Sequence, residues 1–125
     1  MCCYDNPIFA MTEAPGVRRI LFICYQNRRR SATAERLFCK REGLDARSAG
    51  IGPDALVRVN AHMIEWADAI FVMEEAHRRA LERMFPGHAA LKRIISLDIP
   101  DEYGFLDPEL VALLNSRVTH HLQLA

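Results

Sequence analysis

Residues 20–31 read Ile20-Leu21-Phe22-Ile23-Cys24-Tyr25-Gln26-Asn27-Arg28-Arg29-Arg30-Ser31. Four apolar residues lead into a cysteine, five residues separate that cysteine from an arginine, and residues 32–38 have the composition of a helix. The stretch therefore predicts a buried strand, a loop and a helix, in that order. A loop of this length can curl round one tetrahedral oxyanion, with its backbone N–H groups and the start of the helix directed at the anion.

Cys24 stands at the base of this predicted loop, and Arg30 closes it. The loop N–H groups and the arginine favour a thiolate over a thiol, and a thiolate held against a bound phosphate is a nucleophile in position to attack. Ser31 can hydrogen-bond the thiolate, and Asn27 tolerates the left-handed backbone of a tight curl. The alternative interpretation is a buried core cysteine followed by a solvated basic turn.

Cys24–Ser31 resembles the active-site loop of the low-molecular-weight protein tyrosine phosphatases, which has the pattern Cys-x5-Arg-Ser and an asparagine three residues after the cysteine. Further stretches are similar to that family's second-strand exit, third strand and acid loop, and they follow in the same order: Ser48-Ala49-Gly50, Ala67–Glu74 and Asp101-Glu102-Tyr103. The similarity runs from about Arg18 to the C-terminus. The chain resembles most a short, less characterised branch of the family.

The resemblance implies a phosphomonoester hydrolase, of the protein tyrosine phosphatase type, that works through a cysteinyl-phosphate intermediate. It assigns the nucleophile to Cys24, the phosphate clamp to Arg30 and the general acid to Asp101. The whole loop would bind the phosphate: Tyr25, Gln26, Asn27, Arg28, Arg29, Arg30 and Ser31. The resemblance also assigns roles that support the active-site loop to four residues: Asn27, Ser31, Ser48 and Tyr103. The expected substrate is a phosphorylated protein or a small phosphomonoester, and no metal or other cofactor is expected.

Three aspartates compete for the role of the acid. Asp101 lies in a loop two residues before Tyr103, where the family has Asp-Pro-Tyr, although a glutamate replaces the proline here. Asp98, at the end of the predicted fourth strand, is the second candidate. Asp107 precedes Pro108 and is more simply the N-cap of the last helix. Tyr103 has two interpretations: a wall of the cleft beside an aryl leaving group, or an aromatic ring packed at the sheet edge.

The loop departs from the family's pattern at two places. Gln26 stands where the family often has glycine, so its side chain would strain the curl if the backbone there needs a positive φ. Arg28 and Arg29 replace apolar or cysteine residues and add positive charge near the mouth of the site. That charge favours anionic substrates through electrostatic steering.

Strand-like and helix-like segments alternate along the chain. The predicted strands are residues 17–23, 44–48, 68–73 and 91–97, and the predicted helices are residues 31–42, 60–66, 74–85 and the segment that begins at Pro108. The alternation predicts an α/β fold: a single three-layer domain with a four-stranded parallel sheet, order 2-1-3-4, and helices on both faces. In that order the loop after the first strand lies at the switch point, and the loop from Asp98 to Asp107 comes over Cys24.

The composition bounds the class of protein. The chain has 125 residues, of which 50% are hydrophobic, and a formal net charge of zero. We expect one domain at 17–125 after a flexible N-terminal extension at 1–16. The balanced charge favours neither nucleic acid nor a membrane as partner, and no apolar run approaches the ~20 residues of a membrane helix. A basic cluster is interpreted as a solvated helix face: His77, Arg78, Arg79 and Arg83.

Four cysteines, two of them adjacent, do not suggest a disulfide framework, so a cytoplasmic location is expected. Two rival functions share the loop. An arsenate reductase needs further thiols that can attack an adduct on Cys24, and Cys39 is poorly placed for that because it lies two turns along the same helix. A non-catalytic phosphate or phosphopeptide binder needs no acid over the loop. The sequence does not indicate an oligomeric state.

Overall fold

The architecture described below is that of a computed structural model, and it covers residues 18–89 and 92–122. The predicted N-terminal extension, residues 1–16, lies outside these residues, as do Cys2 and Cys3. The domain boundary at residue 17 therefore stays a prediction.

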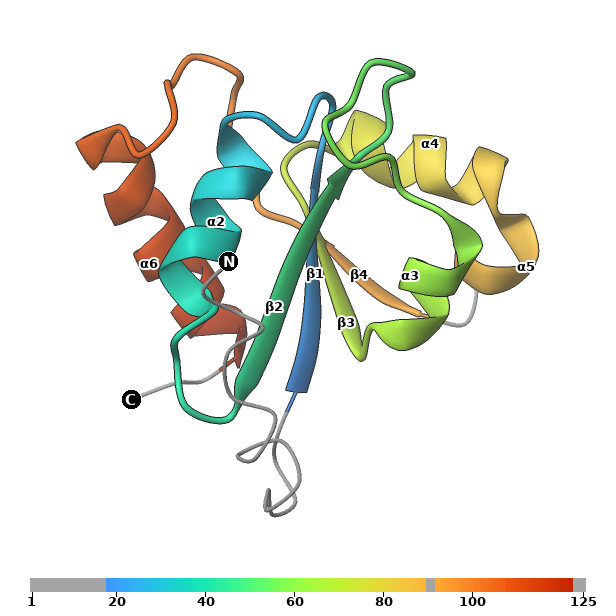
Figure 1. The fold of residues 1–125 in the computed structure, drawn as a ribbon, viewed down its shortest axis with the longest axis horizontal. Coiled ribbons are helices and arrows are strands. Elements are labelled where there is room, and N and C mark those ends of the chain that lie inside the picture. Colours follow the sequence, from blue (N-terminus) through green and yellow to red (C-terminus); the bar gives the residue numbers. More distant parts are fainter. Residues whose placement is uncertain (1–17, 90–91, 123–125) are drawn as a thin grey trace.

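Four parallel strands form one sheet in the order β2-β1-β3-β4. They are β1 (Arg18–Cys24), β2 (Leu44–Gly50), β3 (Ala69–Val72) and β4 (Arg93–Ser96). The central strand β1 pairs with β2 from Arg18 to Cys24 and with β3 from Ile20 to Ile23. The predicted parallel sheet and its strand order are confirmed (Figure 1).

Helices cover both faces of the sheet, which confirms the three layers. One face carries α2 (Arg30–Phe38) and α6 (Pro108–Leu122), and the other carries α3 (Ala61–Trp66), α4 (Glu75–Met84) and α5 (Pro86–Ala89) (Figure 1). As predicted, Asn60 caps α3, because its side-chain oxygen accepts a hydrogen bond from the backbone N–H of Met63 at 2.9 Å.

The residues of β1 alternate between two hydrophobic cores, as side chains of a central strand must. Phe22 lies in the core under α2 and α6, with ring centroids 5.8 Å from Phe38 and 5.7 Å from Phe71. Leu21 and Ile23 lie in the core on the opposite face. Four successive residues of β1, Ile20 to Ile23, are completely buried. The cores therefore hold the strand, and with it Cys24 at its end, in one position.

The first helix is shorter than the sequence indicated. It was expected to reach Glu42 but ends at Phe38, and a turn follows in which the N–H of Arg41 donates to the carbonyl of Phe38. Gly43 then takes a positive φ of 86° and directs the chain into β2. The chain must reverse here because Leu44 pairs with Arg18 at the start of β1. This tertiary constraint outweighs the helix propensity of residues 39–42.

The end of β2 passes directly beneath the residues that follow β1. A Cβ atom added to Gly50 would lie 2.5 Å from the carbonyl oxygen of Tyr25 and 2.7 Å from the Cβ of Ala55. Both contacts are shorter than van der Waals separation. Gly50 is therefore required because the backbone of the loop approaches closely, which explains the Ser-Ala-Gly sequence at this strand exit.

We expect Gly50→Ala to lower the free energy of unfolding by ~1–3 kcal/mol, because the loop backbone must move to admit the methyl group. Urea denaturation measures the loss. Gly87→Ala is the matched control: it lies in α5, and an added Cβ meets nothing within 4 Å. That variant should be neutral or stabilised by up to ~1 kcal/mol. Equal stability of the two variants would contradict the packing argument.

Candidate active site

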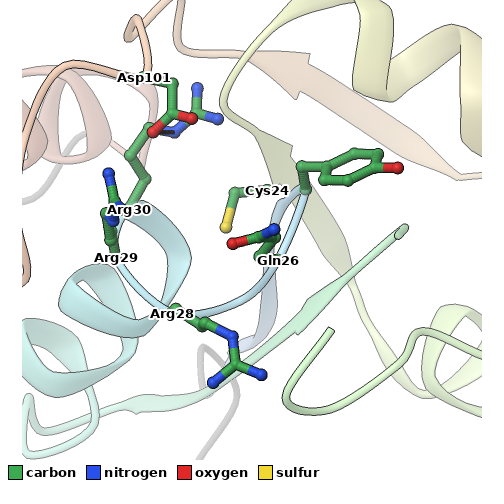
Figure 2. A pocket seen from close by; sticks show the side chains of 7 residues that line it. Cys24, Gln26, Arg28, Arg29, Arg30 and Asp101 are labelled. Atoms are coloured by element: carbon green, nitrogen blue, oxygen red, sulfur yellow. Dashed lines mark ion pairs between the residues drawn. The ribbon is translucent and has the colours of Figure 1, made fainter. Parts of the chain in front are cut away.

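Three connecting segments meet at the carboxyl end of the sheet: residues 25–29 after β1, 51–60 after β2, and 97–107 after β4 (Figure 1). A pocket of about 270 Å³ opens there (Figure 2). It is lined by Cys24, Tyr25, Gln26, Arg28, Arg29, Arg30 and Asp101. The structure thus brings the three residues expected to be catalytic into one cavity, although they come from two distant parts of the chain.

The carbonyl groups at the start of the loop are tied to the segment behind it. The carbonyls of Cys24, Tyr25 and Gln26 accept hydrogen bonds from the N–H groups of Ile51 (3.1 Å), Gly52 (2.8 Å) and Leu56 (3.0 Å). In a trans peptide the C=O and the following N–H point in opposite directions, and the described residues contain no cis bond. The N–H groups of residues 25–27 therefore point away from this segment, toward the inside of the curl.

Asn27 is the turning point of the loop. Its φ is 60°, a left-handed conformation that asparagine tolerates better than most residues, as the sequence analysis expected. Gln26 has no positive φ, so the strain considered for this position does not arise. The side chain of Asn27 is buried and donates from Nδ2 to Ser31 Oγ and to Ser48 Oγ, both at 2.8 Å. Its Oδ1 accepts from the N–H of Val57 at 3.2 Å, so one amide fixes three segments.

Cys24 is buried at the base of the curl, with 3% of its surface exposed. Its Sγ accepts a hydrogen bond from the N–H of Asn27 at 3.2 Å and lies 3.0 Å from Ser31 Oγ. Ser31 Oγ also accepts from Asn27 Nδ2 at 2.8 Å and lies 3.5 Å from the carbonyl oxygen of Ala49, to which it can donate. The two contacts of Sγ hold the sulfur at the base of the curl.

Ser48 joins this network to the first helix. Its hydroxyl donates to Glu35 Oε1 at 2.5 Å while it accepts from Asn27. A supporting role was predicted for Ser48, whereas Glu35 was not among the predicted site residues. The position of Glu35 on the same face of α2 as Ser31, four residues further on, is the signal that could have found it.

Arg30 is almost completely buried, with 3% exposed, and is anchored at one nitrogen. Nη1 donates to Glu74 Oε2 at 2.5 Å and to the carbonyl of Ile99 at 2.8 Å, whereas Nε lies 3.8 Å from Asp101 Oδ1. Among the residues that the structure describes, only Nη1 of this guanidinium makes a hydrogen bond. The opposite edge of the fork, Nε and Nη2, is the edge that can bind an anion in bidentate fashion.

The three candidate acids occupy different environments. Asp101 lines the pocket beside the guanidinium of Arg30 (Figure 2). Asp98 has a left-handed φ of 54° and accepts from Ser96 Oγ at 2.9 Å, and it does not line the pocket. Asp107 accepts from the N–H of Glu109 at 2.8 Å, as an N-cap does. The geometry therefore favours Asp101.

Two other candidate residues lie outside the pocket lining. Tyr103 is half-buried and packs against the core under α2 and α6, which matches the second of its two interpretations. Cys39 is buried at the C-cap of α2, whereas Arg30 begins that helix beside the pocket. The helix has nine residues and is therefore ~14 Å long. Cys39 cannot reach Cys24 across that distance, and, contrary to the expectation from the sequence, it is disulfide-bonded.

The interpretation of residues 77–83 as a solvated basic face is wrong for His77. Its side chain is 4% exposed, and Nδ1 accepts a hydrogen bond from the N–H of Glu74 at 3.2 Å, one half of a reciprocal capping box. Burial, followed by the nearby Arg30 guanidinium, lowers the pKa of His77 from 6.5 to about 4. Arg79 and Arg83 are exposed as expected. The charge pattern did not reveal this, because His77 is buried only by contacts of the folded domain.

The described residues contain no group of three or more histidine, cysteine or acidic side chains placed to hold a metal ion. No helix within 18–89 and 92–122 has the length and apolar character needed to cross a membrane.

Solved structures that are similar to this chain include phosphatases. The tyrosine phosphatase Wzb from Escherichia coli K30 is 21% identical, with a TM-score of 0.70 over 87% of this chain and 99% of its own. The YwlE arginine phosphatase from Geobacillus stearothermophilus is 22% identical, with a TM-score of 0.67 over 85% and 93%. A low-molecular-weight protein tyrosine phosphatase from T. tengcongensis is 20% identical, with a TM-score of 0.63 over 82% and 99%.

No protein-family model matches the chain, and no curated protein matches it in sequence. The similarity to these solved structures is therefore a similarity of three-dimensional fold. The chain has the fold of the low-molecular-weight protein tyrosine phosphatases, and the resemblance noted in its sequence is confirmed at the level of the fold.

The lowered pKa of His77 predicts a pH-dependent stability. Between pH 6.5 and about 4, His77 binds a proton in the unfolded chain but not in the folded chain. The free energy of unfolding therefore falls as the pH falls through this window. The loss from this one group is at most ~3 kcal/mol. His77→Gln should flatten the unfolding free energy between pH 6.5 and 4, whereas His62→Gln, at an exposed position of α3, should not. An unchanged profile in His77→Gln would refute the assignment.

Proposed function

We propose that this protein is a cysteine-dependent phosphatase that hydrolyses phosphomonoesters through a cysteinyl-phosphate intermediate, with phosphotyrosine as the substrate class. The observation that carries the proposal is the position of Cys24. Its sulfur lies at the base of a loop whose N–H groups point inward, and the same pocket holds a buried arginine and an exposed carboxyl group. These are the parts that an in-line displacement at phosphorus requires.

In the first step the Cys24 thiolate attacks the phosphorus atom, so that a P–S bond forms while the ester P–O bond breaks. The loop N–H groups of residues 25–31 and the Nε–Nη2 edge of Arg30 neutralise the phosphoryl oxygens. Asp101 gives its proton to the departing oxygen. Cys24 and Asp101 line the same cavity, which supports this division of roles.

In the second step water attacks the same phosphorus atom, and the Asp101 carboxylate takes the proton of that water. The P–S bond breaks, inorganic phosphate is released, and the thiolate returns. The hydrogen bonds of Ser31 and Asn27 to the sulfur stabilise this leaving group. One carboxyl group thus serves as acid and then as base.

The structural neighbours support this chemistry. The E. coli Wzb tyrosine phosphatase was solved in complex with phosphate. A YwlE variant in which serine replaces the active-site cysteine carries a phosphorylated active-site serine. A phosphate group on the serine that replaces the cysteine is expected if the residue at this position is the nucleophile. We propose the same role for Cys24.

The neighbours include tyrosine and arginine phosphatases, and the charge of the pocket favours the first for this chain. Arg28, Arg29 and Arg30 line the cavity together with Asp101. A guanidine leaving group acquires positive charge as it departs, which three neighbouring arginines oppose. A phenol departs without positive charge, so an aryl phosphate suits this cavity better.

The two rival functions have less support. Arsenate reduction requires a second thiol near Cys24, and Cys39 lies at the far end of α2. A pure binding module would need no acid, yet Asp101 faces the cavity. A thiolate nucleophile works in a reducing compartment, so we propose that the protein acts in the cytoplasm.

Asp101→Asn tests the proposal through its dependence on the leaving group. We expect the variant to hydrolyse phenyl phosphate ~10²–10⁴-fold more slowly than the parent, because phenolate needs a proton to depart. p-Nitrophenyl phosphate, which has a good leaving group, should lose far less. Steady-state kinetics with both esters measures the difference.

Asp98→Asn is the control, since Asp98 lies outside the pocket lining. It should show a mild loss that is the same for both esters. The assignment moves to Asp98 if the leaving-group dependence appears in that variant instead. Absence of phosphomonoester hydrolysis in the unmodified protein would refute the proposed function itself.

A further inference from the structure

Exposed apolar side chains gather at the active-site end of the molecule. The large apolar residues that are exposed in the described part of the chain are Tyr25 (49%), Leu56 (64%), Val57 (42%), Phe105 (47%) and Leu106 (39%). All five belong to the three segments that meet at the carboxyl end of the sheet. Single exposed apolar residues are ordinary, but their confinement to one end of the protein indicates a surface that contacts another molecule.

Two exposed arginines stand beside part of this surface. Arg28 and Arg29 line the mouth of the pocket, and Arg28 donates from Nη2 to the carbonyl of Asp54 at 3.3 Å. That contact places the guanidinium next to the segment that carries Leu56 and Val57. In Figure 2, Arg28 and Asp101 lie on opposite sides of Cys24. Neither Arg28 nor Arg29 forms an ion pair with a carboxylate of the described residues.

We propose that Arg28, Arg29, Leu56 and Val57 form a basic-apolar rim that binds the chain of an acidic phosphopeptide beside its phosphorylated residue. This inference rests on the proposed function and adds the specificity of that site. The arginines would hold acidic side chains adjacent to the phosphorylated residue, and the two apolar residues would contact an apolar side chain further along.

The rim is suited to a peptide more than to a small phosphomonoester. The phosphate is held by the loop backbone and Arg30, so Arg28 and Arg29 keep their side-chain charge for another part of the substrate. Leu56 N–H donates to the carbonyl of Gln26, and Val57 N–H donates to Asn27 Oδ1. The apolar residues are thus fixed to the phosphate loop, at a place where a flanking residue of a bound peptide would lie. A small molecule has no segment that reaches them.

Attraction between exposed charges is modest and is screened by salt. Two arginines acting together on two acidic residues should raise kcat/KM for a peptide by about tenfold at low ionic strength, mostly through faster association. The preference should shrink as salt is added. An apolar contact would not be weakened by salt in this way, so the two halves of the rim can be separated experimentally.

The test uses the full chain and three phosphotyrosine peptides that differ only beside the phosphotyrosine, where they carry two Glu, two Gln or two Lys. Hydrolysis is measured at low and high salt for the parent protein, for Arg28→Gln/Arg29→Gln, and for Arg79→Gln. Arg79 is the matched control, an exposed arginine on α4 outside the pocket lining. We expect an order Glu, Gln, Lys in the parent and in Arg79→Gln. In the double variant, the ratio of kcat/KM for the Glu peptide to kcat/KM for the Gln peptide should fall from about ten to near one.

A second comparison tests the apolar half. A peptide with Leu further along the chain is compared with the same peptide carrying Ser there, and the preference for Leu should disappear in Leu56→Ser/Val57→Ser. Each ratio is formed within one variant, so a general loss of activity does not affect it.

The outcomes separate this inference from the proposed function. Suppose that the parent hydrolyses p-nitrophenyl phosphate and also hydrolyses the Glu, Gln and Lys peptides at rates equal to one another. The proposed rim is then refuted, while the phosphatase function stands. If the double variant loses activity on a small aryl bisphosphate but not on the Glu peptide, the arginines serve a second phosphate group and the peptide proposal is wrong. If the parent hydrolyses none of these esters, the proposed function fails first.

Discussion

Three backbone hydrogen bonds, from Ile51, Gly52 and Leu56 to the carbonyls of residues 24–26, control the direction of the loop that follows β1. A peptide whose carbonyl points outward must point its N–H inward, so these bonds create the inward-facing donors. They form only because the exit of β2 lies against the loop. Gly50 passes beneath Tyr25, and a Cβ on Gly52 would lie 2.7 Å from the Tyr25 ring. Small residues at the strand exit are therefore a condition for the site.

Arg30 connects the remaining parts. It begins α2, is paired with Glu74 at the N-cap of α4, and donates to the carbonyl of Ile99 after β4. A buried guanidinium without these partners would carry a large desolvation cost. Glu74 in turn is held by the capping box with His77. Elements on both faces of the sheet thus meet at Arg30. Asp101 is two residues after Ile99 and therefore also lies beside the Arg30 guanidinium.

Local signals predicted much of the fold. The apolar run into Cys24 indicated a central strand, and the alternation of elements indicated the parallel sheet and its order. The spacing from Cys24 to Arg30 and Ser31 indicated the loop, and the motif at residues 101–103 drew attention to Asp101, which lines the pocket. The predictions that were wrong concerned features that depend on residues far away in the sequence. The end of α2 is set by pairing of Leu44 with Arg18, and His77 is buried in the folded domain close to Arg30, which lies far away in the sequence.

The central claim is that Cys24 becomes phosphorylated during turnover. The most direct measurement is a rapid denaturing quench of the protein mixed with excess p-nitrophenyl phosphate, followed by mass spectrometry of its proteolytic fragments. We expect phosphate on the fragment that contains Cys24, at that sulfur, appearing together with the first release of p-nitrophenol. Phosphate on a different residue, or turnover during which no protein-bound phosphate forms, would contradict it.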